Sequence, residues 1–361
     1  MKIASIIGAR PNFIKLAPVS KEIKEIRKEF DEVLVHTGQH YDYEMNKIFF
    51  DELGIPEPDY HLGAGSGSHG YQTGEMLKRI EEVLMKEKPD LVLVFGDTNT
   101  TLAGALAAIK LHIKVGHIEA GLRSFDKRMP EEIEINRALT DHCSDILFCP
   151  TATSVENLKR EGVTNGVYLT GDVMVDALRN NIEIAEKKSK ILDELDLKPE
   201  EYYLATVHRA ENTDDFSRLR SIVDAFCEIV HIVFPCHPRT EKMLKKFDLW
   251  DRLQKSVKVI KPVGYLDMLV LEKNARKNLT DSGGVQKEAY IFKVPCITLR
   301  ENTEWVETVE DGWNVLVGAN DGAIIKMAND FEPKGKQRDV FGDGKAGERV
   351  AKMIEEEKWI R

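Results

Sequence analysis

The stretch NLTDSGGVQKEA, residues 278–289, passes from a short apolar strand through Asp-Ser-Gly-Gly directly into a helix. Backbone N–H groups and the helix dipole make such a turn an anion site, and glycines let a ligand approach closely. Glu288, one helical turn further on, is placed to accept hydrogen bonds from ribose hydroxyls. A plain strand-to-helix turn would explain one glycine. Two glycines and the glutamate together predict that Ser282, Gly283 and Gly284 bind a nucleotide diphosphate.

Short apolar runs alternate with amphipathic stretches along the whole chain. Most of the runs lack polar alternation, which is typical of parallel strands covered on both faces. The predicted strands are 2–7, 32–36, 90–95, 114–118, 145–149, 202–207, 229–234, 257–260, 278–280 and 294–299. The predicted helices are 13–29, 71–88, 100–111, 134–142, 216–229, 285–292 and 346–360, with a helix and connector in 183–201.

The pattern of strands and helices restarts near the middle, and 361 residues predict two domains at about 100–200 residues each. We predict an α/β fold of two doubly wound, Rossmann-like domains, the first over residues 1–170 and the second over 171–345. Ligands bind such sheets outside the carboxyl ends of the strands, so functional side chains should follow strands directly.

Composition argues against several classes of protein. The formal net charge of −10 disfavours nucleic-acid binding. The N-terminal apolar run, residues 3–7, is shorter than a signal peptide requires, and no run approaches the roughly 20 residues of a membrane span. Five scattered cysteines in apolar contexts predict buried free thiols in a cytoplasmic protein, and no Cys/His spacing predicts a metal site.

Basic residues follow the first strand. Residues 8–12 read GARPN and Lys15 lies one turn into the next helix, so Arg10 and Lys15 could point cations toward a ligand. The alternative is an ordinary helix start with solvated charges. Because the loop lacks G-x-G-x-x-G, a nicotinamide site is disfavoured, and we expect no cofactor.

Two carboxylates each follow an apolar strand of the first half. Burying Asp97 or Glu119 at such a position is costly unless the side chain is paired or functional. The structural alternatives are that Asp97 caps a helix, which Thr98 or Asn99 would do equally well, and that Arg123 pairs with Glu119.

Three more glutamates, Glu131, Glu132 and Glu134, begin the next predicted helix. An acidic first turn suits the helix dipole, which is the structural alternative for these residues. If one of them joins Asp97 and Glu119, the crowded carboxylates would have separated pKa values, and one could act as an acid and another as a base.

The second half supplies the remaining candidates. His208 follows a strand and could donate to a phosphate or act near neutral pH, although a lone histidine is more often structural. His237, after the next strand, is a weaker candidate. Tyr265, Arg300 and Glu304 follow neighbouring strands and could complete a nucleotide pocket.

Taken in order, these motifs resemble the non-hydrolysing UDP-N-acetylglucosamine 2-epimerases over nearly the whole chain. The matching segments are GARPNFIK (8–15), TGQHYD (37–42), FGDTNT (95–100), HIEAGLRS (117–124), PEE and NR (130–137), VHRAEN (207–212), DSGGVQKEA (281–289) and FGDG (341–344). The resemblance implies the GT-B architecture, in which two Rossmann-like domains face each other across a cleft. It also implies that the C-terminal helix, 346–361, packs on the first domain and that the protein is a homodimer.

The resemblance further implies interconversion of UDP-N-acetylglucosamine and UDP-N-acetylmannosamine, by anti elimination of UDP to a 2-acetamidoglucal and re-addition. Asp97, Glu119 and one glutamate of the 131–134 group would stabilise oxocarbenium character and move the C2 proton. Lys15 and His208 would assist catalysis by gripping the departing diphosphate. The residues assigned to binding the substrate are Arg10, Lys15, Arg137, His208, Tyr265, Ser282, Gly283, Gly284, Glu288 and Arg300.

The chain departs from the family pattern at two places. PEE and NR are two residues further apart than usual, so Glu131, Glu132 and Glu134 compete for one catalytic position. We favour Glu134, which is in register with the NR pair, and place Glu131 second. The residues after His40 and the glycine-rich segment 62–70 also depart, so allosteric activation by the substrate is not implied.

Three other functions share parts of this pattern. A hydrolysing 2-epimerase would release UDP and N-acetylmannosamine from the same motifs. A GT-B glycosyltransferase would need an acceptor site, for which no feature stands out. A non-catalytic UDP-sugar sensor would keep the nucleotide loop without needing Glu119.

Overall fold

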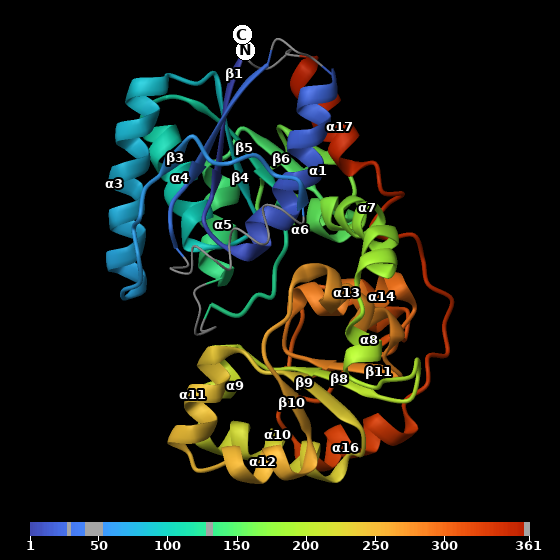
Figure 1. Cartoon of the computed structure of the whole chain (residues 1–361). Helices are drawn as coiled ribbons and strands as arrows, with labels where there is room; N and C mark the ends of the chain where they lie inside the picture. Colours follow the sequence, from blue (N-terminus) through green and yellow to red (C-terminus); the bar gives the residue numbers. More distant parts are fainter. Residues whose placement is uncertain (27–29, 40–52, 128–132, 357–361) are drawn as a thin grey trace. The chain divides into compact units, whose positions relative to one another are not determined.

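The computed structural model describes residues 1–26, 30–39, 53–127 and 133–356, which belong to two compact units (Figure 1). Unit 1 comprises Met1–Asn180 and Asp339–Arg361, and unit 2 comprises Asn181–Arg338. The chain leaves unit 1 within one helix, α7 (Val173–Lys188). It returns before residue 346, because the Asp172 N–H donates to Phe341 O (2.9 Å) and holds the returning segment. Both boundaries therefore differ from the predicted ones.

Unit 1 is built on a parallel sheet whose strand order reverses between β1 and β4. Within the described residues the order is β3-β2-β1-β4-β5-β6-β7, and each pair is parallel. The strands are β1 (Lys2–Ile7), β2 (Asp31–His36), β3 (Tyr60–His61), β4 (Leu91–Phe95), β5 (Lys114–Ile118), β6 (Ile146–Cys149) and β7 (Val167–Leu169). Ile3 pairs in register with Glu32 on one side and Leu91 on the other.

Helices alternate with these strands. They are α1 (Arg10–Ile26), α3 (His69–Glu87), α4 (Asn99–Lys110), α5 (Ile133–Cys143), α6 (Ala152–Arg160), the first part of α7, and α17 (Ala346–Glu355). α4 lies very close to the sheet at Gly104, where an added Cβ would be 3.0 Å from Val94 and 3.2 Å from Ile6. α17 packs along α1, so the last helix of the chain completes unit 1 (Figure 1).

Unit 2 repeats the same topology. Its sheet has the order β10-β9-β8-β11-β12-β13 in the described chain, again all parallel, with the reversal between β8 and β11. The strands are β8 (Tyr203–Thr206), β9 (Ile232–Pro235), β10 (Lys258–Ile260), β11 (Lys277–Thr280), β12 (Cys296–Thr298) and β13 (Asn314–Leu316). The helices are α8 (Ile191–Glu194), α9 (Ala210–Thr213), α10 (Phe216–Glu228), α11 (Pro238–Lys246), α12 (Trp250–Ser256), α13 (Tyr265–Asn274), α14 (Gly283–Phe292), α15 (Val306–Glu310) and α16 (Asp321–Asp330).

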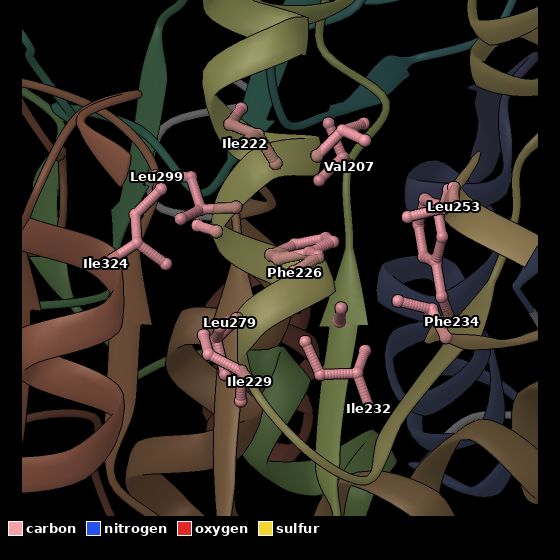
Figure 2. Close-up of a cluster of buried hydrophobic side chains, with 14 of the residues drawn as sticks. Val207, Ile222, Phe226, Ile229, Ile232, Phe234, Leu253, Leu279, Leu299 and Ile324 are labelled. Atoms are coloured by element: carbon pink, nitrogen blue, oxygen red, sulfur yellow. The ribbon is translucent and has the colours of Figure 1, made fainter. Parts of the chain in front are cut away.

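The core of unit 2 lies between α10 and the sheet. Figure 2 shows Phe226 of α10 among Ile222, Ile229 and Phe234, all of them buried. The rings of Phe226 and Phe234 meet edge to face, with centroids 6.0 Å apart. Burying one such side chain contributes about 1.5–3 kcal/mol, so this cluster holds the strands whose ends carry the site.

The predicted strands and helices are present, with ends shifted by one or a few residues. Sequence patterning misses β3, β7 and β13, because strands of two or three residues show no periodicity. The predicted helices 13–29 and 346–360 extend beyond the described residues. The predicted α/β class with two doubly wound sheets is confirmed.

Candidate active site

The predicted motifs lie at the two positions where strand order reverses. In unit 1, GARPN follows β1 and Asp97 follows β4, which is its neighbour in the sheet. In unit 2, His208 follows β8 and Asp281 follows β11, again neighbours. Doubly wound sheets bind ligands outside the carboxyl ends of strands at such a reversal, so each unit presents one candidate half-site.

The loop after β1 is organised by Asn12. Its Oδ1 accepts from the N–H groups of Gly8 (3.2 Å) and Ala9 (3.0 Å), and its Nδ2 donates to Phe95 O (2.7 Å) at the end of β4. A Cβ on Gly8 would lie 2.0 Å from Thr37 Oγ1, so packing within unit 1 already explains that glycine. Arg10 begins α1 directly after this loop.

Lys15 and Glu119 form a buried ion pair in unit 1. Lys15 Nζ donates to Glu119 Oε2, and each residue is only 6% exposed. The pair closes over Gly96, where an added Cβ would lie 2.6 Å from Lys15 Nζ and 3.2 Å from Glu119 Oε2. The lysine that we assigned to the diphosphate therefore contacts a predicted catalytic carboxylate. Arg123 does not pair with Glu119 in this way; it binds Asp141 and Glu161 instead.

Glu119 has a strained backbone. Its φ is +73°, a left-handed conformation that a glutamate rarely adopts. The N–H groups of Glu119 and Ala120 both donate to Phe148 O of β6, at 3.1 Å, and hold the bend in place. Strain of this kind persists only where the surroundings impose it, and it is concentrated at functional sites.

Asp97 is free of the capping role that was its structural alternative. Thr98 is the N-cap of α4: its side chain accepts from Thr101 N, and the Thr98 N–H donates to Thr101 Oγ1 (3.2 Å). Asp97 instead binds Arg137 of α5, with its Oδ2 accepting from Nη2 (2.7 Å) and Nε (3.1 Å). Arg137, the predicted substrate contact, is thus buried against a predicted catalytic residue.

Glu134 holds a neighbouring loop. Its Oε2 accepts from the N–H (2.8 Å) and Oγ (2.9 Å) of Ser124, and its Oε1 accepts from the Phe125 N–H (3.0 Å). Phe125 has a φ of +59°, so these bonds fix an unfavourable turn. Arg137 Nη1 lies 3.7 Å from Glu134 Oε2 and joins it to Asp97. Glu131 and Glu132, the competing glutamates, lie outside the described residues.

Sequence reasoning assigned no role to His117 or Asp141. His117 is fully buried, with Nδ1 2.7 Å from Asp141 Oδ1 and Nε2 2.7 Å from the Gly96 carbonyl. Asp141 Oδ2 also accepts from Gly121 N (3.1 Å) and Arg123 Nη1 (2.7 Å). Burial by itself would raise the pKa of Asp141, but His117 and Arg123 together outweigh it and lower that pKa. This network ties the loops after β4 and β5 together.

In unit 2, buried Asp281 organises the loop that carries His208. The carboxylate accepts from the N–H groups of His208 and Arg209 and from Asn212 Nδ2, all at 3.1 Å. The His208 side chain stays 41% exposed, with Nδ1 3.5 Å from Asp281 Oδ1. Its ring lies near that of His237, with centroids 6.1 Å apart, so both predicted histidines lie at one sheet edge.

The Asp-Ser-Gly-Gly turn opens α14, as the sequence predicts. Ser282 is the N-cap and accepts from Val285 N (3.5 Å). The two glycines differ in what surrounds them. A Cβ on Gly283 would lie 2.5 Å from Glu304 Oε1, whereas one on Gly284 would meet nothing nearer than Ser282 Oγ at 3.7 Å. Packing within unit 2 therefore accounts for Gly283 and leaves Gly284 available for a ligand.

The other predicted nucleotide contacts of unit 2 are largely buried. Tyr265 O–H donates to Glu288 Oε1 (3.2 Å), and the two residues are only 4% and 5% exposed. Arg300 is fully buried and its Nη1 lies 2.9 Å from Glu304 Oε2. Arg300 therefore supports the loop beside Gly283, while Glu288 lies one turn into α14 with Tyr265 behind it.

Other predictions about composition have mixed outcomes. Cys149, Cys236 and Cys296 are buried free thiols, whereas Cys143 and Cys227 are partly exposed. Burial raises the pKa of each of the three buried thiols to about 12. In the described ranges no three His, Cys, Asp or Glu side chains gather as metal ligands. None of the helices there is long and apolar enough to span a bilayer. His40 lies outside the described residues.

Known proteins share this chain's sequence and fold over nearly its whole length. A family model for UDP-N-acetylglucosamine 2-epimerase matches residues 21–355. A crystal structure of Methanocaldococcus jannaschii UDP-GlcNAc 2-epimerase in complex with UDP-GlcNAc and UDP is 52% identical, covers 99% of this chain and 100% of that one, and gives a TM-score of 0.93. A UDP-2,3-diacetamido-2,3-dideoxy-D-glucuronate 2-epimerase of Pseudomonas aeruginosa is 50% identical over 98% of this chain and 99% of its own.

The fold extends to more distant proteins. Sucrose-phosphate synthase from Thermosynechococcus elongatus, only 13% identical, matches with a TM-score of 0.63 over 99% of this chain and 98% of that one. The predicted GT-B fold class is thereby confirmed, and the full-length relatives make the protein an isomerase of the epimerase type. The chain belongs to the UDP-N-acetylglucosamine 2-epimerase family.

Proposed function

We propose that the protein interconverts UDP-N-acetylglucosamine and UDP-N-acetylmannosamine by eliminating UDP and adding it back. The observation that carries the proposal is that each unit has its predicted site residues at a strand-order reversal. Unit 1 gathers Asp97, Glu119 and Lys15 around Gly96, and unit 2 offers an anion-binding turn at Gly284. Carboxylates serve the sugar chemistry and the turn serves the diphosphate.

The chemistry follows from the weak acidity of the C2 proton. Loss of UDP breaks the C1–O bond and builds positive charge at C1, which ionised carboxylates stabilise. A carboxylate then takes the C2 proton and the electron pair forms the C1–C2 double bond of a 2-acetamidoglucal. Returning a proton to the opposite face of C2 and re-forming the C1–O bond gives the epimer.

Residues of unit 1 divide between chemistry and support. We assign the proton transfers and charge stabilisation to Asp97 and Glu119, since each carboxylate is paired with a buried cation, Asp97 with Arg137 and Glu119 with Lys15. Lys15 also serves the departing diphosphate. Glu134 is fully engaged with Ser124 and Phe125, which favours a positioning role over the catalytic one that its register suggests.

Unit 2 retains the leaving group. The turn at Ser282, Gly283 and Gly284 binds the diphosphate, with the N–H groups of the two glycines as donors because the Ser282 N–H donates to Thr280 Oγ1. His208 donates to the diphosphate, and Glu288 accepts from the ribose hydroxyls. UDP is a free intermediate product during the reaction. This half-site must therefore hold UDP until C2 has been protonated on its opposite face and the C1–O bond can form again.

Deuterium exchange tests the reaction directly. Incubating the protein with UDP-N-acetylglucosamine in D2O should place deuterium at C2 of both sugars, with no net release of UDP. Stoichiometric UDP release would instead identify a hydrolysing 2-epimerase. Absence of exchange in wild type, with UDP binding intact, would identify a sensor.

The substrate has a second candidate. The Pseudomonas relative is about as similar to this chain, at 50% identity, as the Methanocaldococcus enzyme is, at 52%, so the same exchange assay should be run with UDP-2,3-diacetamido-2,3-dideoxy-D-glucuronate. The substrate with the higher kcat/KM is the one that the enzyme prefers. Light scattering would test the homodimer that the family resemblance implies.

The phosphate assignment has its own test. Lys15→Ala and His208→Ala should each weaken UDP binding by about tenfold or more, since a charged hydrogen bond contributes roughly 1.5–3 kcal/mol. Removing Lys15 also leaves Glu119 buried without that cation. The melting temperature of Lys15→Ala must therefore be measured together with its UDP affinity. UDP affinity equal to wild type in both variants would contradict the assignment.

A further inference from the structure

Unit 2 contains a buried carboxyl group for which the reaction above has no use. Glu272, near the end of α13, is fully buried, and neither of its side-chain oxygens accepts a hydrogen bond from a donor in the described chain. An ionised carboxylate left this way would be very costly. The position therefore needs a physical explanation.

The explanation lies in its neighbour. α13 packs on α14, and Glu272 lies two helical turns after Tyr265 on the same face of α13, the face whose Tyr265 hydroxyl donates to Glu288. The Glu272 carboxyl is therefore a neighbour of the Glu288 carboxyl. Two ionised carboxylates can only accept, so their contact becomes a hydrogen bond only when one of them carries a proton. Burial, and then the nearby charge of Glu288, raise the pKa of Glu272 well above its ordinary value.

We propose that Glu272 is a positioning residue for nucleotide binding, whose neutral carboxyl group donates to Glu288 and turns the Glu288 carboxylate toward the ribose. This inference rests on the proposed ribose contact of Glu288. It adds a residue outside the motifs, because Glu272 lies on α13, which carries the predicted contact Tyr265 but none of the matching segments.

The surroundings of Glu288 fit this role. Its Oε1 accepts from Tyr265 O–H at 3.2 Å, and its Oε2 lies 4.0 Å from where a Cβ on Gly284 would be. Two donors on α13, Tyr265 and in this proposal Glu272, thus hold the Glu288 carboxylate. Its Oε2 lies beside the turn that would bind the diphosphate. Burial, followed by the charge of Glu288, also raises the pKa of Tyr265, so that phenol remains a donor.

The proton belongs on Glu272 rather than on Glu288. Glu272 is fully buried, whereas Glu288 retains 5% exposure beside the turn. Within the described chain, two further titratable groups near Glu272 are the Cys296 thiol on β12 and the Tyr202 phenol ahead of β8, and burial raises the pKa of both. These groups are neutral at pH 7, so they add no cation that would ionise Glu272.

The test compares two substitutions with two ligands. Glu272→Gln keeps a donor of the same shape, and Glu272→Met keeps the volume without a donor. UDP and 2′,3′-dideoxy-UDP differ only in the ribose hydroxyls that Glu288 would bind. By calorimetry we expect Glu272→Met to bind UDP about tenfold more weakly and the dideoxy ligand as wild type does, and Glu272→Gln to bind both within about twofold of wild type.

A structural control uses the same helix. Leu269 of α13 is fully buried and apolar, so Leu269→Ala should loosen α13 without removing a donor to Glu288. It should change the affinities for the two ligands by the same factor. If Glu272→Met also weakens both ligands equally, or if Glu272→Gln is as damaging as Glu272→Met, the inference is overturned. Should Glu272→Met fail to fold, Glu272→Leu takes its place.

A further variant separates this inference from the proposed function. Glu288→Ala should abolish the preference for UDP over the dideoxy ligand. If that preference survives in Glu288→Ala, the ribose contact itself is wrong and the inference falls with it. If Glu288→Ala loses the preference while Glu272→Met keeps it, Glu288 binds the ribose and the role of Glu272 alone is refuted.

Discussion

At the scale of single residues, Gly283 and Gly284 have the same side chain for different physical reasons. Gly283 leaves room for Glu304, whose Oε1 would lie 2.5 Å from an added Cβ. Gly284 has only ordinary contacts, the nearest at 3.7 Å. The sequence motif does not distinguish the two glycines, whereas the surrounding atoms explain Gly283 by packing and leave Gly284 open for the proposed ligand.

Substituting each glycine by alanine should separate these roles. Gly284→Ala should leave the melting temperature unchanged or slightly raised, because alanine is favoured over glycine in a helix by about 1 kcal/mol. The new methyl group would occupy the approach to the backbone and weaken UDP binding by at least about tenfold. Gly283→Ala should instead cost about 1–3 kcal/mol of stability, since Glu304 must move.

Thermal unfolding without ligand and calorimetry with UDP would check both variants. If Gly284→Ala binds UDP as tightly as wild type does, the diphosphate does not lie against this turn.

Glu134 is the residue at which register and contacts disagree. It accepts three hydrogen bonds from Ser124 and Phe125, so Glu134→Ala would leave those donors unsatisfied at about 1–3 kcal/mol in total. We expect a lower melting temperature and slower deuterium exchange at C2, in proportion to the disorder of that loop. Glu119→Gln, the matched variant, should abolish exchange while the fold persists. Abolished exchange in Glu134→Ala with an unchanged melting temperature would make Glu134 the acid or base after all.

At the scale of helices and strands, the start of α17, the last helix of unit 1, is bound by one buried carboxylate. Asp176 of α7 accepts from the N–H groups of Ala346 (3.1 Å) and Gly347 (2.8 Å) and so caps α17. Gly347 lies close to α1, with an added Cβ 3.0 Å from Pro18 O. Asp176 thus links α17, the last helix of the chain, to α7, the helix through which the chain leaves unit 1.

This cap predicts a pH dependence of stability. Burial raises the pKa of Asp176 to about 6, although the two backbone N–H groups oppose the rise. Because the folded state binds this proton more tightly than the unfolded state does, the protonation adds stability below the unfolded pKa, near 4, and the gain disappears as pH rises through about 6. Relative to Asp176→Asn, wild type should gain about 1 kcal/mol between pH 7 and pH 5.

Urea unfolding of both proteins across that pH range would measure the difference. Other titrating groups contribute equally to the two curves and cancel in the comparison. A difference that does not change with pH would show that Asp176 keeps its ordinary pKa in the folded protein.

The sequence predicts elements better than it predicts partners. Apolar runs at strand spacing locate β1, β4 and β5 because parallel strands buried on both faces need no other signal. Lys15 and Glu119 are 104 positions apart, and only the packing of α1 against the sheet brings them together. The same applies to Asp97 with Arg137, and to His117, whose partners lie on two other elements. Chemical type and strand-end position can be read locally, but which charge neutralises which cannot.

At the scale of the whole molecule, the two units share one order of strands around the reversal but carry different functional groups at it. Unit 1 has acids held by buried cations, and unit 2 has a helix N-terminus and a histidine. Neither half-site is sufficient for an elimination in which the leaving group is kept. The proposed reaction therefore gives each unit its own part in handling UDP, Lys15 in unit 1 and the turn at Gly284 in unit 2.

Hydrogen exchange of the full chain would test this assignment. Saturating UDP should protect residues 206–213 and 281–289 of unit 2 and also residues 8–15 of unit 1, with opening free energies raised by about 2.7 kcal/mol at a hundred times Kd. Lys15→Ala should lose the protection of 8–15 and retain that of 281–289, because only one of the two grips is removed. Protection confined to unit 2 in wild type would mean that unit 1 does not hold the diphosphate. Lys15 would then serve Glu119 alone, and retention of UDP would depend entirely on the turn at Gly284.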